Sequence, residues 1–136
     1  MVLIFGLLIS NMTNAQTYNI SISIPNLNNK DGEIQFGIYN NKDNFPKVDK
    51  QYKLFIIKTD EFTGTYTIKD LPKGEYAVAL LHDKNADKIC NMNFLGIPKE
   101  GYGFSRNFKP KLSAPTFNDC KIDLTANTSI TIKMLY

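Results

Sequence analysis

The residues of this 136-residue chain that could do chemistry concentrate in one stretch, residues 82–107 (HDKNADKICNMNFLGIPKEGYGFSRN). It contains the only histidine of the chain, His82, and its only arginine, Arg106. The flanking sequence alternates apolar and polar residues, whereas this stretch does not. Because long loops in compact domains are often functional, we expect any function of the protein to lie here.

The first half of the stretch carries carboxylates and amides at alternate positions. Its D-x-N-x-D pattern, which begins at Asp83, is the opening of a calcium loop of EF-hand type. A hard cation needs several oxygens that converge on one point, and alternate residues of a curled loop can supply them. The predicted Ca²⁺ ligands are Asp83, Asn85, Asp87, the backbone carbonyl of Ile89, and Asn91 through a water.

Two residues depart from the calcium-loop pattern. Lys88 stands where a glycine normally makes the sharp turn, and Phe94 stands where a bidentate glutamate belongs. Glu100 could reach the ion from the second half of the stretch. Such a site is expected to be weak, with a Kd of about 10⁻⁴–10⁻³ M. The alternative is an Asx-rich turn whose side chains hydrogen-bond to their own backbone.

The second half of the stretch combines glycines with aromatic residues. Repeated bends separate the aromatic side chains, and an arginine follows them. Aromatic residues and arginine are enriched where proteins bind partners, so this half predicts a site for a glycan or an envelope protein. The alternative is a loop that folds over one end of the domain, with the histidine in a structural role. The predicted binding residues are His82, Tyr102, Phe104 and Arg106.

Catalytic motifs are not found in the sequence. A catalytic triad would have to use His82, and the chain has no G-x-S-x-G motif. A zinc site would need three or four nitrogen or sulfur ligands, and beyond His82 only two cysteines are available. The glycine-rich GIPKEGYGF lacks the G-K-S/T ending of a phosphate loop. We therefore predict a non-catalytic protein, with hydrolysis as a remaining alternative.

The composition is that of a globular domain, with 43% hydrophobic and 21% charged residues. The net charge is +3, and the 16 basic residues are scattered singly along the chain. Nucleic-acid binding requires a dense basic patch or stripe. We therefore expect no nucleic-acid partner.

The N-terminus resembles a signal peptide. Val2–Ile9 is an apolar run too short to span a bilayer, and the small residues Thr13 and Ala15 suit a cleavage before Gln16. The positively charged start that such peptides usually have is missing. We predict a signal peptide over residues 1–15 and one exported domain over residues 16–136, periplasmic or extracellular, without a membrane span.

The two cysteines fit an oxidising compartment. Cys90 and Cys120 could form a disulfide there. The alternative is that both are small buried apolar residues.

The elements that must position these residues are short strands. Tyr52–Thr59 and Tyr76–His82 are apolar on both faces, which predicts central strands. Residues 18–24 and 34–38 are expected to form an antiparallel pair. Period-two alternation predicts further strands over residues 65–68, 117–124 and 129–136.

About seven short strands with turn signals between them, and no helical period, predict an all-β fold. The expected architecture is a seven-stranded antiparallel β-sandwich, immunoglobulin-like or transthyretin-like, with a long loop at 82–107.

Two motifs carry a family resemblance. Residues 65–83 (TYTIKDLPKGEYAVALLHD) are similar to the L-P-x-G-x-Y-x-V strand-turn-strand unit of prealbumin-like and carboxypeptidase-regulatory-like domains, in which Leu71 fills the core and Pro72 and Gly74 shape the turn. The continuation, HDKN followed by NFLGIPKEGYGFSRN, resembles the bacterial domain-of-unknown-function 2141 family of exported proteins.

That family's loop usually reads D-x-N-x-N-G-x-x-D, and here Lys88 replaces the glycine and Asn91 the last aspartate. The resemblance implies the sandwich fold and export, and leaves function open. We therefore predict an exported non-catalytic β-sandwich, an envelope or extracellular binding or accessory module that acts through residues 82–107. The alternative is a structural domain stabilised by Ca²⁺.

Overall fold

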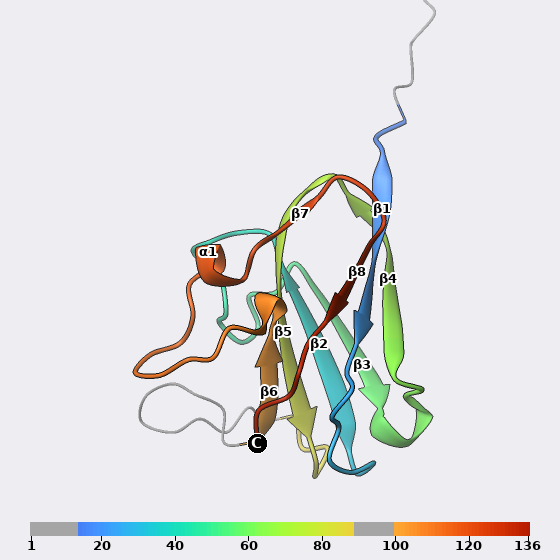
Figure 1. Cartoon of the computed structure of the whole chain (residues 1–136), viewed down its shortest axis with the longest axis vertical. Coiled ribbons are helices and arrows are strands. Elements are labelled where there is room, and N and C mark those ends of the chain that lie inside the picture. The colour runs from blue at the N-terminus through green and yellow to red at the C-terminus, as the bar shows by residue number, and fades with distance from the viewer. Residues whose placement is uncertain (1–13, 89–99) are drawn as a thin grey trace, which may run out of the picture.

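The structure, a computed structural model, describes residues 14–88 and 100–136. Within these ranges the chain forms two facing β-sheets (Figure 1), which confirms the predicted all-β sandwich. The smaller sheet has the order β4-β1-β8, and the larger has the order β3-β2-β5-β6, with β7 paired to β5 off that path. The strands are β1 (Thr17–Ser23), β2 (Glu33–Tyr39), β3 (Lys53–Lys58), β4 (Thr65–Pro72), β5 (Gly74–Asp83), β6 (Gly101–Phe104), β7 (Ile122–Leu124) and β8 (Thr128–Thr131). The helical turns are η1 (Thr59–Glu61), η2 (Ser105–Asn107) and α1 (Phe117–Cys120).

The main core lies between the two sheets and follows from the period-two alternation. Ile20 and Ile22 of β1 point inward from the smaller sheet, and Ile34, Phe36 and Ile38 of β2 point inward from the larger one. All five side chains are fully buried. Burial of such a side chain stabilises the fold by roughly 1.5–3 kcal/mol, so this alternation is the main determinant of the sandwich.

The predicted pairing of the first two strands is wrong. β1 pairs antiparallel with β4 and parallel with β8, whereas β2 pairs with β3 and β5. The connection after β1 crosses from one sheet to the other instead of closing a hairpin. Both strands can therefore turn their apolar faces toward the same core from opposite sides.

Two strands with apolar residues on both faces have different positions. β5 lies between β2 and β6, which confirms its prediction as a central strand. β3 lies at the edge of the sheet and pairs only with β2 in the described part of the chain, so its prediction as a central strand is wrong. Its second apolar face, which includes Leu54 and Ile56, is exposed on the outer surface of the larger sheet.

Two further segments differ from the sequence-based expectation. Residues 117–124 do not form one strand, because a capping box between Thr116 and Asp119 starts the single helical turn α1 and leaves only β7 extended. The last part of the 82–107 stretch is not a loop, because Gly101–Phe104 form β6, which pairs antiparallel with β5 and leads into η2. A Cβ on Gly101 would lie 2.3 Å from the Tyr136 ring, so glycine allows the C-terminal residue to pack on β6.

A second, smaller core lies on the outer face of the larger sheet. The Phe45 ring makes edge contacts with the rings of Tyr39, Phe104 and Phe117, at centroid distances of 5.1, 6.0 and 6.2 Å. Buried Ser105 ties this core to the sheet, since its hydroxyl accepts from Val78 N (2.9 Å) and donates to the Cys120 carbonyl (2.6 Å). This core covers only part of the outer face. In the described residues no helix has the length and apolar character needed to cross a membrane.

Candidate functional site

The uncovered part of the outer face forms the floor of a groove. The strand register places Leu54 of β3 opposite Gly37 of β2, and Gly37 opposite Ala79 of β5, so the three residues share a face. Two residues further along each strand, Ile56 and Leu81 lie on the same face. Residue 37 is a buried glycine, and the side chains of Gln51 and Tyr39 pack over it.

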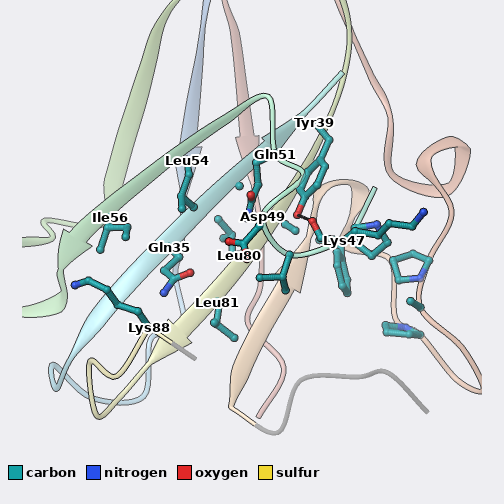
Figure 2. A pocket seen from close by; sticks show the side chains of 18 residues that line it. Gln35, Tyr39, Lys47, Asp49, Gln51, Leu54, Ile56, Leu80, Leu81 and Lys88 are labelled. Carbon is teal, nitrogen blue, oxygen red and sulfur yellow. Dashed lines mark hydrogen bonds between the residues drawn. The ribbon is translucent and has the colours of Figure 1, made fainter. Parts of the chain in front are cut away.

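Loops from both sides wall this floor, and the resulting groove has a volume of about 420 Å³ (Figure 2). That volume lies within the range of small-molecule sites in proteins. The residues that line the groove are Gln35, Gly37, Tyr39, Pro46, Lys47, Val48, Asp49, Gln51, Leu54, Ile56, Ala79, Leu80, Leu81, Lys88, Phe104, Pro110, Ala114 and Pro115.

Large apolar side chains are unusually exposed at this groove. The exposed fractions are 43% for Leu54, 41% for Ile56 and 43% for Val48, and the neighbouring Tyr52 is 42% exposed. Contiguous exposed apolar residues with polar residues around them mark binding sites in soluble proteins. The sequence carried a signal for this site, the second apolar face of β3, which we interpreted as a central strand.

A few polar groups lie around the apolar floor. The Tyr39 hydroxyl donates to the Lys47 carbonyl (3.0 Å) and fixes the loop wall to β2. Figure 2 shows Lys47 and Lys88 on opposite sides of the floor. Lys88 Nζ forms an ion pair with Glu33 at 3.4 Å. The groove thus has an apolar floor and ammonium groups at both ends.

An acidic cluster lies where β5 ends and β6 begins. One carboxylate oxygen each from Asp83, Asp87 and Glu100 lie within 4.8 Å of one another. Asp83 is fully buried, and its Oδ2 accepts from Lys88 N at 2.7 Å. Within the described residues its Oδ1 has no hydrogen-bond partner, and neither has the buried Oε2 of Glu100.

The electrostatics of this cluster disfavour its negative charge. Burial raises the pKa of Glu100, and the nearby carboxylates of Asp83 and Asp87 raise it further, while Lys84 acts in the opposite direction. Three carboxylates that converge on a partly buried point repel one another. The arrangement therefore favours a proton or a cation.

Of the other predicted calcium ligands, only Asn85 lies in the described part of the chain. Asn85 is exposed and makes an Asx turn with Asp87, since its Oδ1 accepts from Asp87 N (3.3 Å) and its Nδ2 donates to Asp87 Oδ2 (3.1 Å). Ile89 and Asn91 lie outside the described residues. Lys88 has a left-handed backbone (φ 60°), the conformation that the glycine expected there would adopt freely.

The predicted binding residues do not form one patch. His82 is fully buried on the inner face, where its Nε2 donates to the Asp31 carbonyl (2.9 Å) and its Nδ1 accepts from the Tyr136 hydroxyl (3.1 Å). Phe104 lines the groove but is 5% exposed, and the Tyr102 ring lies 5.8 Å from it. Arg106 donates to the Asn118 carbonyl at 3.4 Å, beside α1.

Cys120 is buried in the second core and has no disulfide partner among residues 14–88 and 100–136. Burial, aided by the charge of Asp119, raises the pKa of its thiol to about 12. Its predicted partner, Cys90, lies outside the described residues, so the disulfide stays a prediction.

Comparison with known proteins identifies one family. A family model described as "Uncharacterized protein conserved in bacteria (DUF2141)" matches residues 22–133, a range that includes both the groove floor and the acidic cluster. No curated protein and no solved structure matches the chain. The structure buries Leu71 and Val78 in the main core, but the resemblance of residues 65–83 to prealbumin-like domains stays a prediction.

Proposed function

This chain belongs to the DUF2141 family of uncharacterised bacterial proteins, and from that premise we propose that it is an exported, non-catalytic binding module. Its site is the groove on the outer face of the larger sheet, and its ligand is a small molecule with an apolar body. The observation that carries the proposal is the groove floor, where Leu54 and Ile56 are more than 40% exposed within a hollow of about 420 Å³.

The lining favours an amphiphile over a glycan. Sugars need many hydrogen-bonding side chains, whereas the centre of this floor presents aliphatic groups from β3 and β5. The Lys47 ammonium at one side of the floor suits a ligand with an anionic end, whereas Lys88 at the other side is paired with Glu33. A medium-chain carboxylate combines both features.

Export and the absence of catalysis are parts of the same proposal. The apolar run Val2–Ile9, followed by small residues at Thr13 and Ala15, supports export. The hydrogen bonds of His82 support a structural role, because both of its ring nitrogens are engaged by Asp31 and Tyr136 in the interior. A general base needs a ring nitrogen free to meet a substrate.

A displacement assay tests the groove. Protein purified after expression of the full chain is titrated with anilinonaphthalene sulfonate, an anionic aromatic probe, and then with dodecanoate or maltotetraose. We expect saturable fluorescence that dodecanoate displaces and maltotetraose does not. Non-saturable fluorescence, or displacement by the oligosaccharide alone, would overturn the proposal.

Two matched variants locate the probe. Ile56→Lys places a charge in the groove floor, and the affinity for the probe should fall about tenfold, because roughly 1–2 kcal/mol of apolar contact is lost. Leu112→Lys makes the same kind of change at an apolar residue that is 82% exposed and lies outside the groove lining. It should leave the affinity unchanged, and an equal effect of both variants would contradict the groove as the site.

A further inference from the structure

The acidic cluster contains a buried carboxylate oxygen, Asp83 Oδ1. Asp83 is fully buried, its Oδ2 is occupied by Lys88 N, and its Oδ1 has no hydrogen-bond partner within the described residues. A buried charged oxygen without a partner is expensive and rare in native proteins. We propose that Asp83, Asp87 and Glu100 bind one Ca²⁺ at the end of β5 and β6.

Strand pairing explains why two of these ligands meet. β5 and β6 are antiparallel with His82 opposite Gly101, and this register places the next residue of β5, Asp83, beside the residue that precedes β6, Glu100. The third ligand comes from the turn after β5, which Ala86 N closes by donating to the Asp83 carbonyl (3.3 Å). A cation here would cross-link the ends of two strands.

The separation of the oxygens fits calcium. Ca²⁺ holds its oxygen ligands at 2.3–2.6 Å, so two oxygens on opposite sides of the ion are about 5 Å apart. The three carboxylate oxygens lie within 4.8 Å of one another, a spread that one Ca²⁺ can bridge. Mg²⁺ demands a tighter octahedron, with opposite oxygens about 4 Å apart. Asp87 is exposed, which leaves room for water as the remaining ligands.

The neighbouring charges are compatible with a cation. The carboxylates of Asp83, Asp87 and Glu100 converge within 4.8 Å, and a divalent cation would remove the repulsion between them. Lys88 Nζ forms its ion pair with Glu33. Lys84 Nζ lies 5.2 Å from the centroid of the Tyr136 ring. The basic side chains on this turn therefore have partners outside the cluster.

This ligand set differs from the one that the loop pattern predicts. Asp83 and Asp87 are common to both sets, whereas Glu100 supplies the third carboxylate from the position before β6. Asn85 instead makes its two hydrogen bonds with Asp87. The site is therefore a strand-end site that uses one loop carboxylate, and it does not need the bidentate glutamate of an EF-hand.

Thermal unfolding of chelator-treated protein, purified after expression of the full chain, tests the proposal. With a Kd of about 10⁻⁴–10⁻³ M, a tenfold excess of Ca²⁺ over Kd should raise the melting temperature by roughly 4–8 °C. The rise should be absent in Asp83→Asn and in Glu100→Gln. These changes keep the shape of the side chain, and the asparagine can still accept from Lys88 N.

Two controls and a spectroscopic probe separate this site from general effects. Asp123→Asn and Glu61→Gln remove exposed carboxylates away from the cluster and should keep the full rise. The chain has no tryptophan, so Tb³⁺ emission excited at the tyrosine band reports an ion near a tyrosine such as Tyr136. We expect stoichiometric emission that Ca²⁺ displaces and Asp83→Asn abolishes. No Ca²⁺-dependent rise, or an equal rise in the two cluster variants, would overturn the site, and an equal rise with Mg²⁺ would overturn the choice of calcium.

Discussion

The groove and the acidic cluster flank the same strand, β5, and they depart from ordinary burial in opposite ways. In the groove, Leu54 and Ile56 leave more than 40% of their surface in water. In the cluster, Asp83 is fully buried, and its Oδ1 has no hydrogen-bond partner among the residues that the structure describes. Exposed apolar clusters and buried unpaired polar atoms are the informative exceptions to the usual arrangement of side chains. Each exception here would be resolved by a different ligand.

The two regions share one residue but have separate supports. Lys88 binds Asp83 through its backbone N–H and lines the groove with its side chain. The groove wall packs on the second core around Phe45. The acidic cluster is instead held in place by the close approach of Gly32 to the backbone of Asp83. The regions can therefore be disturbed one at a time.

The largest expected effect comes from removing the support of the groove. Phe45→Ala deletes a buried ring that contacts the rings of Tyr39, Phe104 and Phe117, and it should lower the free energy of unfolding by about 3–5 kcal/mol. Urea unfolding measures this change. The folded variant should lose affinity for anilinonaphthalene sulfonate and keep its response to Ca²⁺.

The matched control for that variant is Val48→Ala, which shortens an exposed apolar side chain of the same loop and should change the free energy of unfolding by about 0.5 kcal/mol or less. If Phe45→Ala abolished the Ca²⁺ response while the protein remained folded, the two regions would not be independent.

A second variant disturbs the acidic end. Gly32 has φ +70°, and a Cβ there would lie 1.9 Å from the Asp83 carbonyl oxygen, so Gly32→Ala must push the preceding turn away from β5. Strain and displacement together should lower the free energy of unfolding by roughly 2–4 kcal/mol. The melting-temperature rise with Ca²⁺ should shrink, and probe binding in the groove should persist.

Gly64→Ala is the control for Gly32→Ala. Gly64 also has a positive φ (+103°), but a Cβ there would meet no atom within 4 Å. This variant carries the backbone strain without the clash, and its Ca²⁺ response should equal that of the unaltered protein. Equal responses in the two glycine variants would show that the turn does not support the acidic end.

The sequence predicted the parts of the fold that depend on local periodicity. Ile20 and Ile22 of β1 and the two-faced apolar segment of β5 were identified as core because a strand turns alternate residues to one side. The pairing of β1 was not predictable in this way, since alternation does not state which sheet a strand joins. The helical turn at Phe117–Cys120 was missed because the capping box of Thr116 and Asp119 decides it within one turn.

In the candidate sites, too, the sequence predicted what depends on local spacing and missed what depends on strand pairing. Asp83 and Asp87 were identified from their spacing, which is local information. Glu100 was considered as a contributor, but only the pairing of His82 with Gly101 places it beside Asp83. The groove was missed because a strand with two apolar faces has the same sequence pattern in two situations. It can be a central strand covered on both faces, or an edge strand whose outer face lines a groove, as β3 does.

The smallest expected effect concerns the segment that connects the groove wall to α1. Asp119 Oδ2 accepts from Thr116 N and from the Thr116 hydroxyl, both at 2.8 Å, directly after the wall residues Ala114 and Pro115. These hydrogen bonds, with Arg106 as a lesser cause, lower the pKa of Asp119 below its ordinary 3.8.

A carboxylate whose folded-state pKa is lowered stabilises the folded state above its ordinary pKa, and that contribution is lost as the pH falls through the folded-state value. Asp119→Ala should therefore melt below the unaltered protein at pH 7, and the gap should narrow as the pH is lowered from about 4 toward 2. Melting curves across that range measure the gap. A gap that stayed constant to pH 2 would assign the effect of Asp119 to packing instead of charge, and the groove wall would then owe nothing to its capping carboxylate.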